Sequence, residues 1–168
     1  RAYPEALNKE LFPWLKSLYK VWAHIQPEML SVSTELALSE LLLSGCTTAS
    51  DHHYLFPSQL ENAIDIQVEQ AQKLGMRVVL TRGSMSLGEK DGGLPPQSVV
   101  QTKEQILSDS ERLINSYHNA DEGAMTQIAL APCSPFSVTT ELMQDTAELA
   151  EQYDVRLHTH LAETIDEE

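Results

Sequence analysis

The sequence has few cysteines and few basic residues. Only Cys46 and Cys133 occur among the 168 residues, far apart and outside any CxxC pair, which excludes a disulfide framework and a cysteine-rich metal cage. We expect both to be small buried hydrophobic residues. The 11 Lys and Arg against 25 Asp and Glu give a formal net charge of −14. A nucleic acid polymer or an anionic membrane surface would repel such a chain, so neither is an expected partner.

The chain also lacks a long hydrophobic run. No stretch reaches the length needed to span a bilayer, and the first residues, RAYPEALNKE, do not have the basic and then apolar pattern of a signal peptide. We therefore expect a cytoplasmic protein. Because residue 1 is Arg and not Met, we expect the natural chain to start further upstream. An apolar fraction of 42% with 21% charged residues is typical of a soluble globular domain.

Four segments have the three- or four-residue hydrophobic spacing of amphipathic helices. Ser58 with Glu61, and Thr102 with Gln105, have the spacing of a capping box, and Gly75 is placed to end its helix in the left-handed conformation. The predicted helices are residues 27–45, 58–75, 102–118 and 139–153.

A short apolar or β-branched run follows each predicted helix, at residues 46–50, 76–81, 126–131 and 155–161. Strands that alternate with helices must run parallel, because each helix carries the chain back across the sheet. The sequence therefore predicts the α/β class. A closed (β/α)8 barrel needs eight strands and typically ~250 residues, so four strands indicate part of such a barrel, about strands two to five. The Gly- and Pro-rich insertion 82–101 is either a tolerated surface loop or an active-site lid.

Polar and reactive side chains gather where the predicted strands end. That edge is where α/β folds bind ligands. The candidates are His52, His53, Arg82, Ser134 and Phe136, followed by His158, His160 and Glu163 in and after the last run. In contrast, His24 and His118 fall on helical or loop segments, and we interpret them as structural.

The pattern HxHxxE at the last run predicts hydrolytic chemistry. His158 and His160 are two residues apart on a strand and so point to the same face, which in a barrel is the interior. Glu163 follows at the rim. A metal lowers the pKa of bound water toward ~7 and a neighbouring carboxylate can carry the proton. The alternative is a buried polar network. Pro132-Cys133 is not followed by a second cysteine at the spacing of the cytidine-deaminase zinc signature, so that signature is absent.

The stretch HTHLAETIDEE, with APCSPFSVT, TRGSMSLGEKDGGLPP and GCTTASDHHYLFP, resembles the amidohydrolase superfamily in its guanine-deaminase-like and chlorohydrolase-like group. The resemblance covers nearly the whole chain. It implies a distorted (β/α)8 barrel with one divalent metal, usually zinc, held in part by His160, with Glu163 as the proton carrier and His158 as an inward-facing support. The other metal ligands of that family have no counterpart here. Residues 1–168 are therefore expected to be an internal part of the barrel domain, cut in a strand-to-helix loop after Glu168.

The resemblance further implies hydrolytic deamination of an aromatic nitrogen heterocycle, with 8-oxoguanine converted to urate and ammonia as the expected reaction. Substrate contacts are expected from His52, His53, Arg82, Ser134 and Phe136. A related triazine, pterin or guanine aminohydrolase, or a chlorohydrolase, is the first alternative, and a non-catalytic partial-barrel module is the second. We expect the complete protein to bind a small heterocycle and to form a homo-oligomer. The isolated segment is expected to be inactive and to aggregate.

Overall fold

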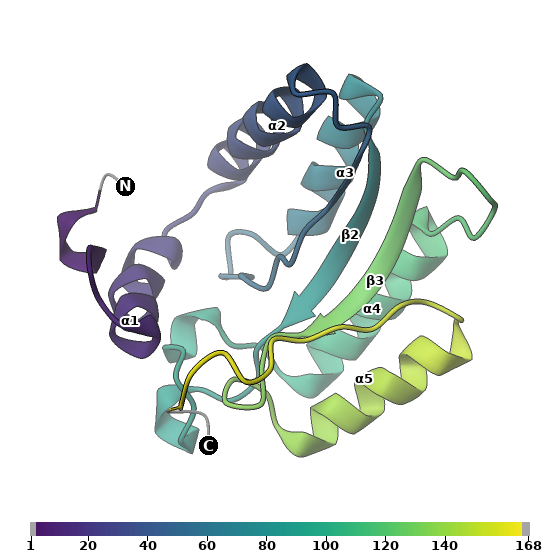
Figure 1. Cartoon of the computed structure of the whole chain (residues 1–168). Helices are drawn as coiled ribbons and strands as arrows, with labels where there is room; N and C mark the ends of the chain where they lie inside the picture. Colours follow the sequence, from purple (N-terminus) through teal and green to yellow (C-terminus); the bar gives the residue numbers. More distant parts are fainter. Residues whose placement is uncertain (1–2, 166–168) are drawn as a thin grey trace.

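The computed structural model describes residues 3–165, and within them helices alternate with the strands of one parallel sheet (Figure 1). The predicted end of the chain in a loop after Glu168 lies outside the described residues. The helices are α1 (Leu11–Trp22), α2 (Pro27–Leu43), α3 (Ala63–Leu74), α4 (Lys103–Tyr117) and α5 (Thr140–Gln152). The strands are β1 (Thr48–Ser50), β2 (Arg77–Ser84) and β3 (Thr126–Pro132), and the short 3-10 helices are η1 (Pro4–Ala6), η2 (Glu89–Asp91) and η3 (Gln97–Val99).

The sheet has the order β1-β2-β3, and both strand pairs are parallel. Ala49 lies opposite Val78 in the first pair, and Leu80 lies opposite Ile128 in the second. The order along the sheet follows the order along the chain. The strands are parallel because each connecting helix returns the chain to the start of the next strand. The prediction of a parallel α/β fold is confirmed.

The prediction of a fourth strand at residues 155–161 is wrong. This segment runs beside β3 (Figure 1), but it forms a single isolated parallel bridge, between Leu130 and Leu157. Its main chain exchanges bonds with β3 at Leu130, which donates to Arg156 O at 2.9 Å and accepts from His158 N at 3.1 Å. No described strand lies on its other side, so half of its backbone groups have no ladder to join.

Local sequence signals account for several helix ends. Thr102 and Gln105 form the predicted capping box of α4, and Gly75 ends α3 with φ 68°. The predicted box of Ser58 and Glu61 is wrong, because α3 begins at Ala63 and its N-cap makes no side-chain bond. Residues 57–60 instead close a turn.

Helix α1 did not follow from the sequence pattern. Its buried side chains, Leu15 and Tyr19, do not pack on the sheet but on a second hydrophobic cluster beyond the carboxyl ends of the strands. This cluster includes Met85, Leu94 and Val99 from the predicted insertion. The insertion is therefore a packed loop that joins α1 to the end of the sheet.

The main core lies between the sheet and its helices. Alternate residues of the strands point to this side, because side chains alternate across a strand. The core contains Val78 and Leu80 from β2, Ile128 and Leu130 from β3, and Ile64, Val68, Leu113 and Ile114 from α3 and α4. Residues between them in the strands, such as Thr81 and Ala129, face the opposite side, which is the interior face of a barrel.

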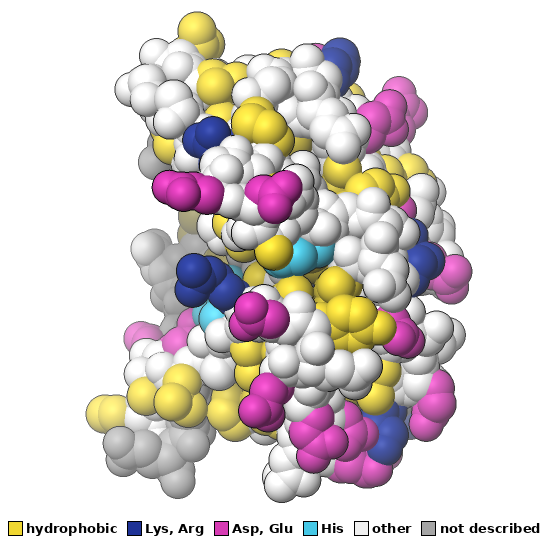
Figure 2. All heavy atoms as spheres, turned by 90° about the vertical axis from the view of Figure 1, so that its right-hand side faces the viewer, with side chains coloured by type: hydrophobic (Ala, Val, Ile, Leu, Met, Phe, Trp, Pro, Cys, Tyr) yellow, Lys and Arg dark blue, Asp and Glu magenta, His cyan; other side chains and the backbone are white. Residues whose placement is uncertain are grey.

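The surface has two features that bear on function. On the face shown in Figure 2, acidic side chains outnumber basic ones, in keeping with the net charge. Met29, Val32, Leu36 and Leu43 of α2 are exposed by 59%, 60%, 60% and 89%, which is unusual for a row of large apolar side chains on one helix. Among the helices of residues 3–165, none combines the length and apolar character needed to cross a membrane.

Candidate active site at the carboxyl end of the sheet

An aromatic-walled pocket of about 200 Å³ lies between α1, the end of β3 and the last described segment. It brings together four of the predicted site residues: His160, Glu163, Ser134 and Phe136. The rest of its lining is Leu11, Trp14, Leu15, Tyr19, Tyr54 and Cys133. The predicted metal ligand, the predicted proton carrier and two predicted substrate contacts therefore share one cavity.

The orientation of His160 is fixed by the main chain of Cys133. Nδ1 of His160 lies 2.8 Å from Cys133 O, and the His160 backbone N–H donates to the same oxygen at 3.0 Å. Because a carbonyl oxygen only accepts, the ring proton is on Nδ1 and Nε2 carries the lone pair. A metal-ligating histidine is commonly held in this way by its other ring nitrogen.

His52 lies against His160, and His158 lies against His52. The rings of His52 and His160 are stacked, with centroids 4.1 Å apart and planes 17° from parallel, and His158 lies 4.7 Å from His52 at 41°. Burial, and next the neighbouring His160, lower the pKa of His52 to about 4, so its ring is neutral at pH 7. Tyr54 meets both stacked rings edge-on.

The described residues fit one ligand of a metal site and no more. Within residues 3–165, no group of three or more His, Cys, Asp or Glu side chains is arranged to hold a metal ion. The bond from Nδ1 to Cys133 nevertheless leaves Nε2 of His160 as a donor suited to a divalent cation. His160 thus fits as a ligand that would need partners from elsewhere in the protein.

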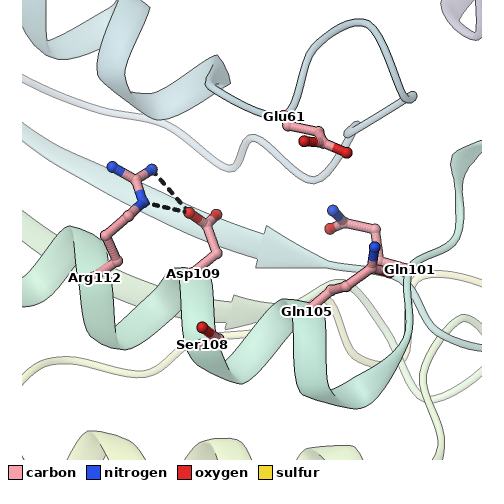
Figure 3. Close-up of a pocket in the computed structure, with 6 residues that line it drawn as sticks. All are labelled: Glu61, Gln101, Gln105, Ser108, Asp109 and Arg112. Atoms are coloured by element: carbon pink, nitrogen blue, oxygen red, sulfur yellow. Dashed lines mark hydrogen bonds and ion pairs between the residues drawn. The ribbon is translucent and has the colours of Figure 1, made fainter.

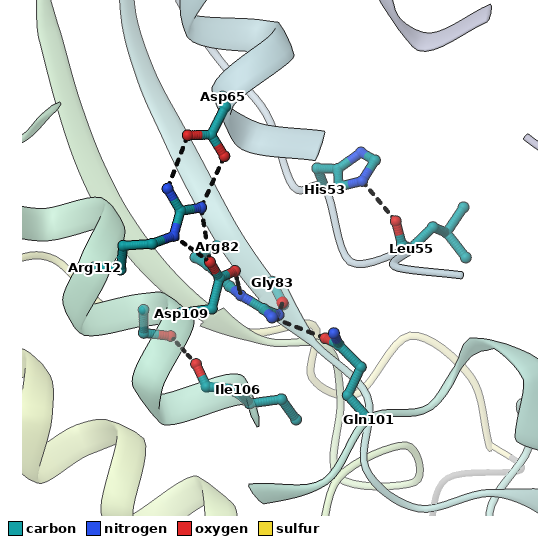
Figure 4. A network of polar contacts seen from close by, with 10 residues as sticks. His53, Leu55, Asp65, Arg82, Gly83, Gln101, Ile106, Asp109 and Arg112 are labelled. Atoms are coloured by element: carbon teal, nitrogen blue, oxygen red, sulfur yellow. Dashed lines mark hydrogen bonds and ion pairs between the residues drawn. The ribbon is translucent and has the colours of Figure 1, made fainter. Parts of the chain in front are cut away.

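Arg82 and His53 do not line this pocket. Arg82 lies on the helix side of β2, where it donates to Asp109 Oδ2 at 2.8 Å and to Gln101 Oε1 at 2.8 Å (Figure 4). Its guanidinium also lies 3.9 Å from the ring centre of Phe56. A third bond goes to the adjacent carbonyl of Gly83. His53 Nε2 lies 2.8 Å from Leu55 O. Both side chains make structural contacts in this conformation.

A second, polar pocket of about 220 Å³ lies on the helix side of the sheet, between α4 and the loop before α3 (Figure 3). Asp109 and Arg112 in its wall are paired with each other, and Arg112 also forms a two-bond ion pair with Asp65. Arg112 lowers the pKa of Asp65 through this bond. Asp109 and Arg112 are thus engaged in a structural network that includes the buried Arg82.

The remaining predicted contacts differ in how available they are. Ser134 is fully buried, and its hydroxyl shares a 2.6 Å hydrogen bond with Ser137. Phe136 lines the pocket and meets Phe12 of α1 edge-on, with centroids 4.9 Å apart. Phe136 therefore forms part of the cavity wall. Ser134 also belongs to the lining, but its side chain is buried and bonded to Ser137.

Sequence reasoning missed several lining residues. Trp14 and Tyr19 belong to α1, where the i, i+4 spacing of Leu15 and Tyr19 was the available signal. Cys133 is buried as predicted, and burial raises the pKa of its thiol to about 11, so it is an uncharged part of the wall. The same prediction was wrong for Cys46, which is half-buried because it lies in the exposed turn after α2.

Parallel strands with helices on one face, and a pocket with His160 and Glu163 beyond their carboxyl ends, define part of a (β/α)8-barrel enzyme fold. The chain belongs to the Amidohydrolase family, whose model matches residues 4–168. It is 67% identical over 168 residues to the 8-oxoguanine deaminase of Pseudomonas aeruginosa. The aligned region covers 100% of this chain and 37% of that protein.

Two further relatives agree with this assignment. The hydroxydechloroatrazine ethylaminohydrolase of Pseudomonas sp. (strain ADP) is 33% identical over 155 residues, covering 92% of this chain and 32% of that protein. The structure superposes with a TM-score of 0.90 on the atrazine chlorohydrolase of Arthrobacter aurescens TC1 complexed with zinc, at 33% identity, covering 99% of this chain and 38% of that one. The chain thus spans less than two fifths of the length of the relatives that it matches.

Proposed function

We propose that the complete protein containing this segment is a metal-dependent deaminase that hydrolyses 8-oxoguanine to urate and ammonia. The main support for the proposal is that His160 and Glu163 line the same pocket. There the Nδ1–H group of His160 donates a hydrogen bond to Cys133 O. The 67% identity to a protein named 8-oxoguanine deaminase favours this substrate. Residues 1–168 then form part of its barrel domain.

The metal in this proposal is one zinc ion, supported by a fold neighbour complexed with zinc. His160 would hold it together with ligands from outside the described residues. When bound, the cation supplies Lewis-acid activation of the attacking water. Glu163 carries the protons, first to a ring nitrogen of the substrate and then to the departing amine, because its carboxylate lies at the rim of the same cavity. Water adds one oxygen to the substrate, and one ammonia leaves.

The walls of the pocket suit a flat heterocycle. Trp14, Tyr19 and Phe136 present aromatic faces or edges, which bind planar rings through stacking and dispersion. Phe136 is the proposed direct substrate contact among the residues predicted from the sequence, with Ser134 behind it. In this proposal His52 supports His160, while His53 and Arg82 hold the surrounding loops in place.

A triazine hydrolase is the second candidate, because two relatives at 33% identity act on triazines by name. A substrate panel separates the two. The purified, zinc-loaded complete protein is supplied in turn with 8-oxoguanine, isoxanthopterin and a hydroxylated triazine, and ammonia and heterocyclic product are quantified. We expect equimolar urate and ammonia from 8-oxoguanine at a kcat/KM at least 100-fold above that of the others. Faster triazine hydrolysis would contradict the substrate assignment, and no turnover of any member would favour a non-catalytic module.

We further propose that the complete protein is a cytoplasmic homo-oligomer. The exposed apolar row on α2 supports the homo-oligomer, since such side chains are usually covered by another part of the chain or by another subunit. Light scattering of the purified protein and cell fractionation test the two statements separately. A monomer, or recovery in the membrane fraction, would contradict them.

A further inference from the structure

We propose that His52 is a positioning residue for His160, whose ring it holds by stacking in the orientation needed for metal binding. This inference rests on the proposed function, because it takes His160 as a metal ligand. The two residues are far apart in the sequence: His52 follows β1, and His160 lies in the segment 155–161 beside β3. Their rings nevertheless lie 4.1 Å apart and nearly parallel.

The contacts around His160 leave its ring little freedom to turn. One edge is fixed by the 2.8 Å bond from Nδ1 to Cys133 O. One face is covered by His52, and Tyr54 stands edge-on at 6.1 Å and 87°. Rotation of the His160 ring would break both the hydrogen bond and the stack. The stack thus supplies a constraint that the single hydrogen bond lacks, since a ring can still tilt about one bond.

His52 itself fits a support and not a ligand of the same ion. The lone pair of an imidazole nitrogen lies in the ring plane, and a Zn–N bond is ~2.0–2.1 Å long. Two nearly parallel rings with centroids 4.1 Å apart cannot both direct an in-plane lone pair at one ion over such bonds. In addition, Nε2 of His52 is buried and has no hydrogen-bond partner among the described residues, while a hydrogen bond with the Ala131 backbone holds the ring in place.

The residues on both sides of His52 are tied to the sheet, which makes the support rigid. Asp51 accepts from the Thr81 backbone N–H at 2.9 Å and from Gln67 Nε2 at 2.7 Å. His53 donates its backbone N–H to Thr81 Oγ1 at 3.0 Å and accepts from Gly83 N at 2.8 Å. A Cβ at Gly83 would lie 2.1 Å from His53 O, so this close approach depends on glycine. The backbone of His52 is thereby held between two anchored neighbours.

The test compares zinc affinity among variants of the complete protein, measured by competition with a chromophoric chelator. The inference predicts that His52→Ala weakens zinc binding ~10-fold or more, the range seen when groups that orient a metal ligand are removed. His52→Phe, which keeps an aromatic face without a ring nitrogen, is expected to bind zinc within threefold of the unchanged protein. His24→Ala, at an exposed histidine that does not line the pocket, is the matched control and should have no effect.

The outcomes separate this inference from the proposed function. Unchanged zinc affinity in His52→Ala would overturn the positioning role while leaving the deaminase proposal intact. A His52→Phe protein as weak as His52→Ala would also overturn it, since stacking would then not be the operative contact. If the unchanged protein binds no zinc, the proposed function fails, and the inference with it. Should His52→Ala fail to fold, His52→Leu, which is of similar size and has no aromatic face, carries the same expectation.

Discussion

His160 and Cys133 are joined by a hydrogen bond of 2.8 Å from the imidazole Nδ1 to the main-chain carbonyl oxygen. Cys133 directly follows β3, so the bond attaches the ring to the carboxyl end of a sheet strand. It also determines the tautomer, because the carbonyl can only accept. The lone pair of Nε2 is then available to a cation, as a metal ligand requires.

The first prediction concerns the two histidines of the HxH pair. His160→Gln in the complete protein should lower the zinc content from about one ion per chain to less than a tenth, and ammonia release should fall with it. His158→Gln is the matched control, because His158 is exposed and is not part of the pocket lining. Metal analysis and an ammonia assay check both. Loss of zinc in His158→Gln with retention in His160→Gln would reverse the assignment.

The second prediction isolates proton transfer. Glu163→Gln keeps the size of the side chain and removes the carboxylate, so kcat should fall by ~10²–10⁴ while zinc content stays unchanged. Glu148→Gln, at an exposed glutamate of α5, should leave both quantities as they are. Steady-state kinetics with metal analysis measures them. A Glu163→Gln enzyme with a kcat within threefold of the unchanged protein would remove Glu163 from the mechanism.

The third prediction concerns the aromatic wall. Phe136→Ala should raise KM for 8-oxoguanine ~10-fold or more with a smaller change in kcat, because the lost contact is to the bound ring and not to the reacting atoms. Phe12→Ala removes the edge contact to Phe136 without changing the lining of the pocket, and its KM should change less than threefold. Equal effects of the two variants would indicate that packing, and not substrate contact, is responsible.

The fourth prediction concerns the buried Arg82, whose side chain is 0% exposed while that of Asp109 is 19% exposed. Asp109→Leu leaves a buried cation without its carboxylate and should cost ~3–5 kcal/mol of unfolding free energy. Arg82→Met should cost less, about 1–2 kcal/mol, because Asp109 keeps its bonds to Arg112 and Met fills the space. Denaturant unfolding of the complete protein measures both. A larger loss in Arg82→Met would refute this account of the network.

The fifth prediction concerns residues 1–168 in isolation. The exposed apolar side chains of α2 and the unpaired edges of the sheet favour association, so light scattering should show oligomers or aggregates. A monomer that melts cooperatively would contradict it.

Elements with local signals were predictable from the sequence. The capping box of α4 and the left-handed Gly75 are determined by residues a few positions apart. In contrast, α1 and the segment 155–161 depend on contacts with distant parts of the chain. The sequence pattern gave no prediction for α1 and a wrong one for the segment 155–161. Arg82 shows the same limit. The strand was predicted to end at Thr81, but β2 continues to Ser84, and strand alternation directs Arg82 to the helix side.

The candidate site could be predicted in part. The HxHxxE spacing pointed to His160 and Glu163, which line one pocket. The walls could not be predicted, because Trp14 and Tyr19 reach the pocket only through the packing of α1 on the insertion. The stack of His52 on His160 also joins residues far apart in sequence, and no local pattern signals it.

The most direct test of metal-dependent hydrolysis at this pocket is product analysis in ¹⁸O-labelled water. The complete protein is incubated with 8-oxoguanine before and after removal of its metal by a chelator, and again after zinc is restored. The account predicts one ammonia and one urate carrying a single ¹⁸O per substrate, loss of both without metal, and recovery with zinc. Undiminished turnover by the metal-free protein, or urate without the label, would contradict it.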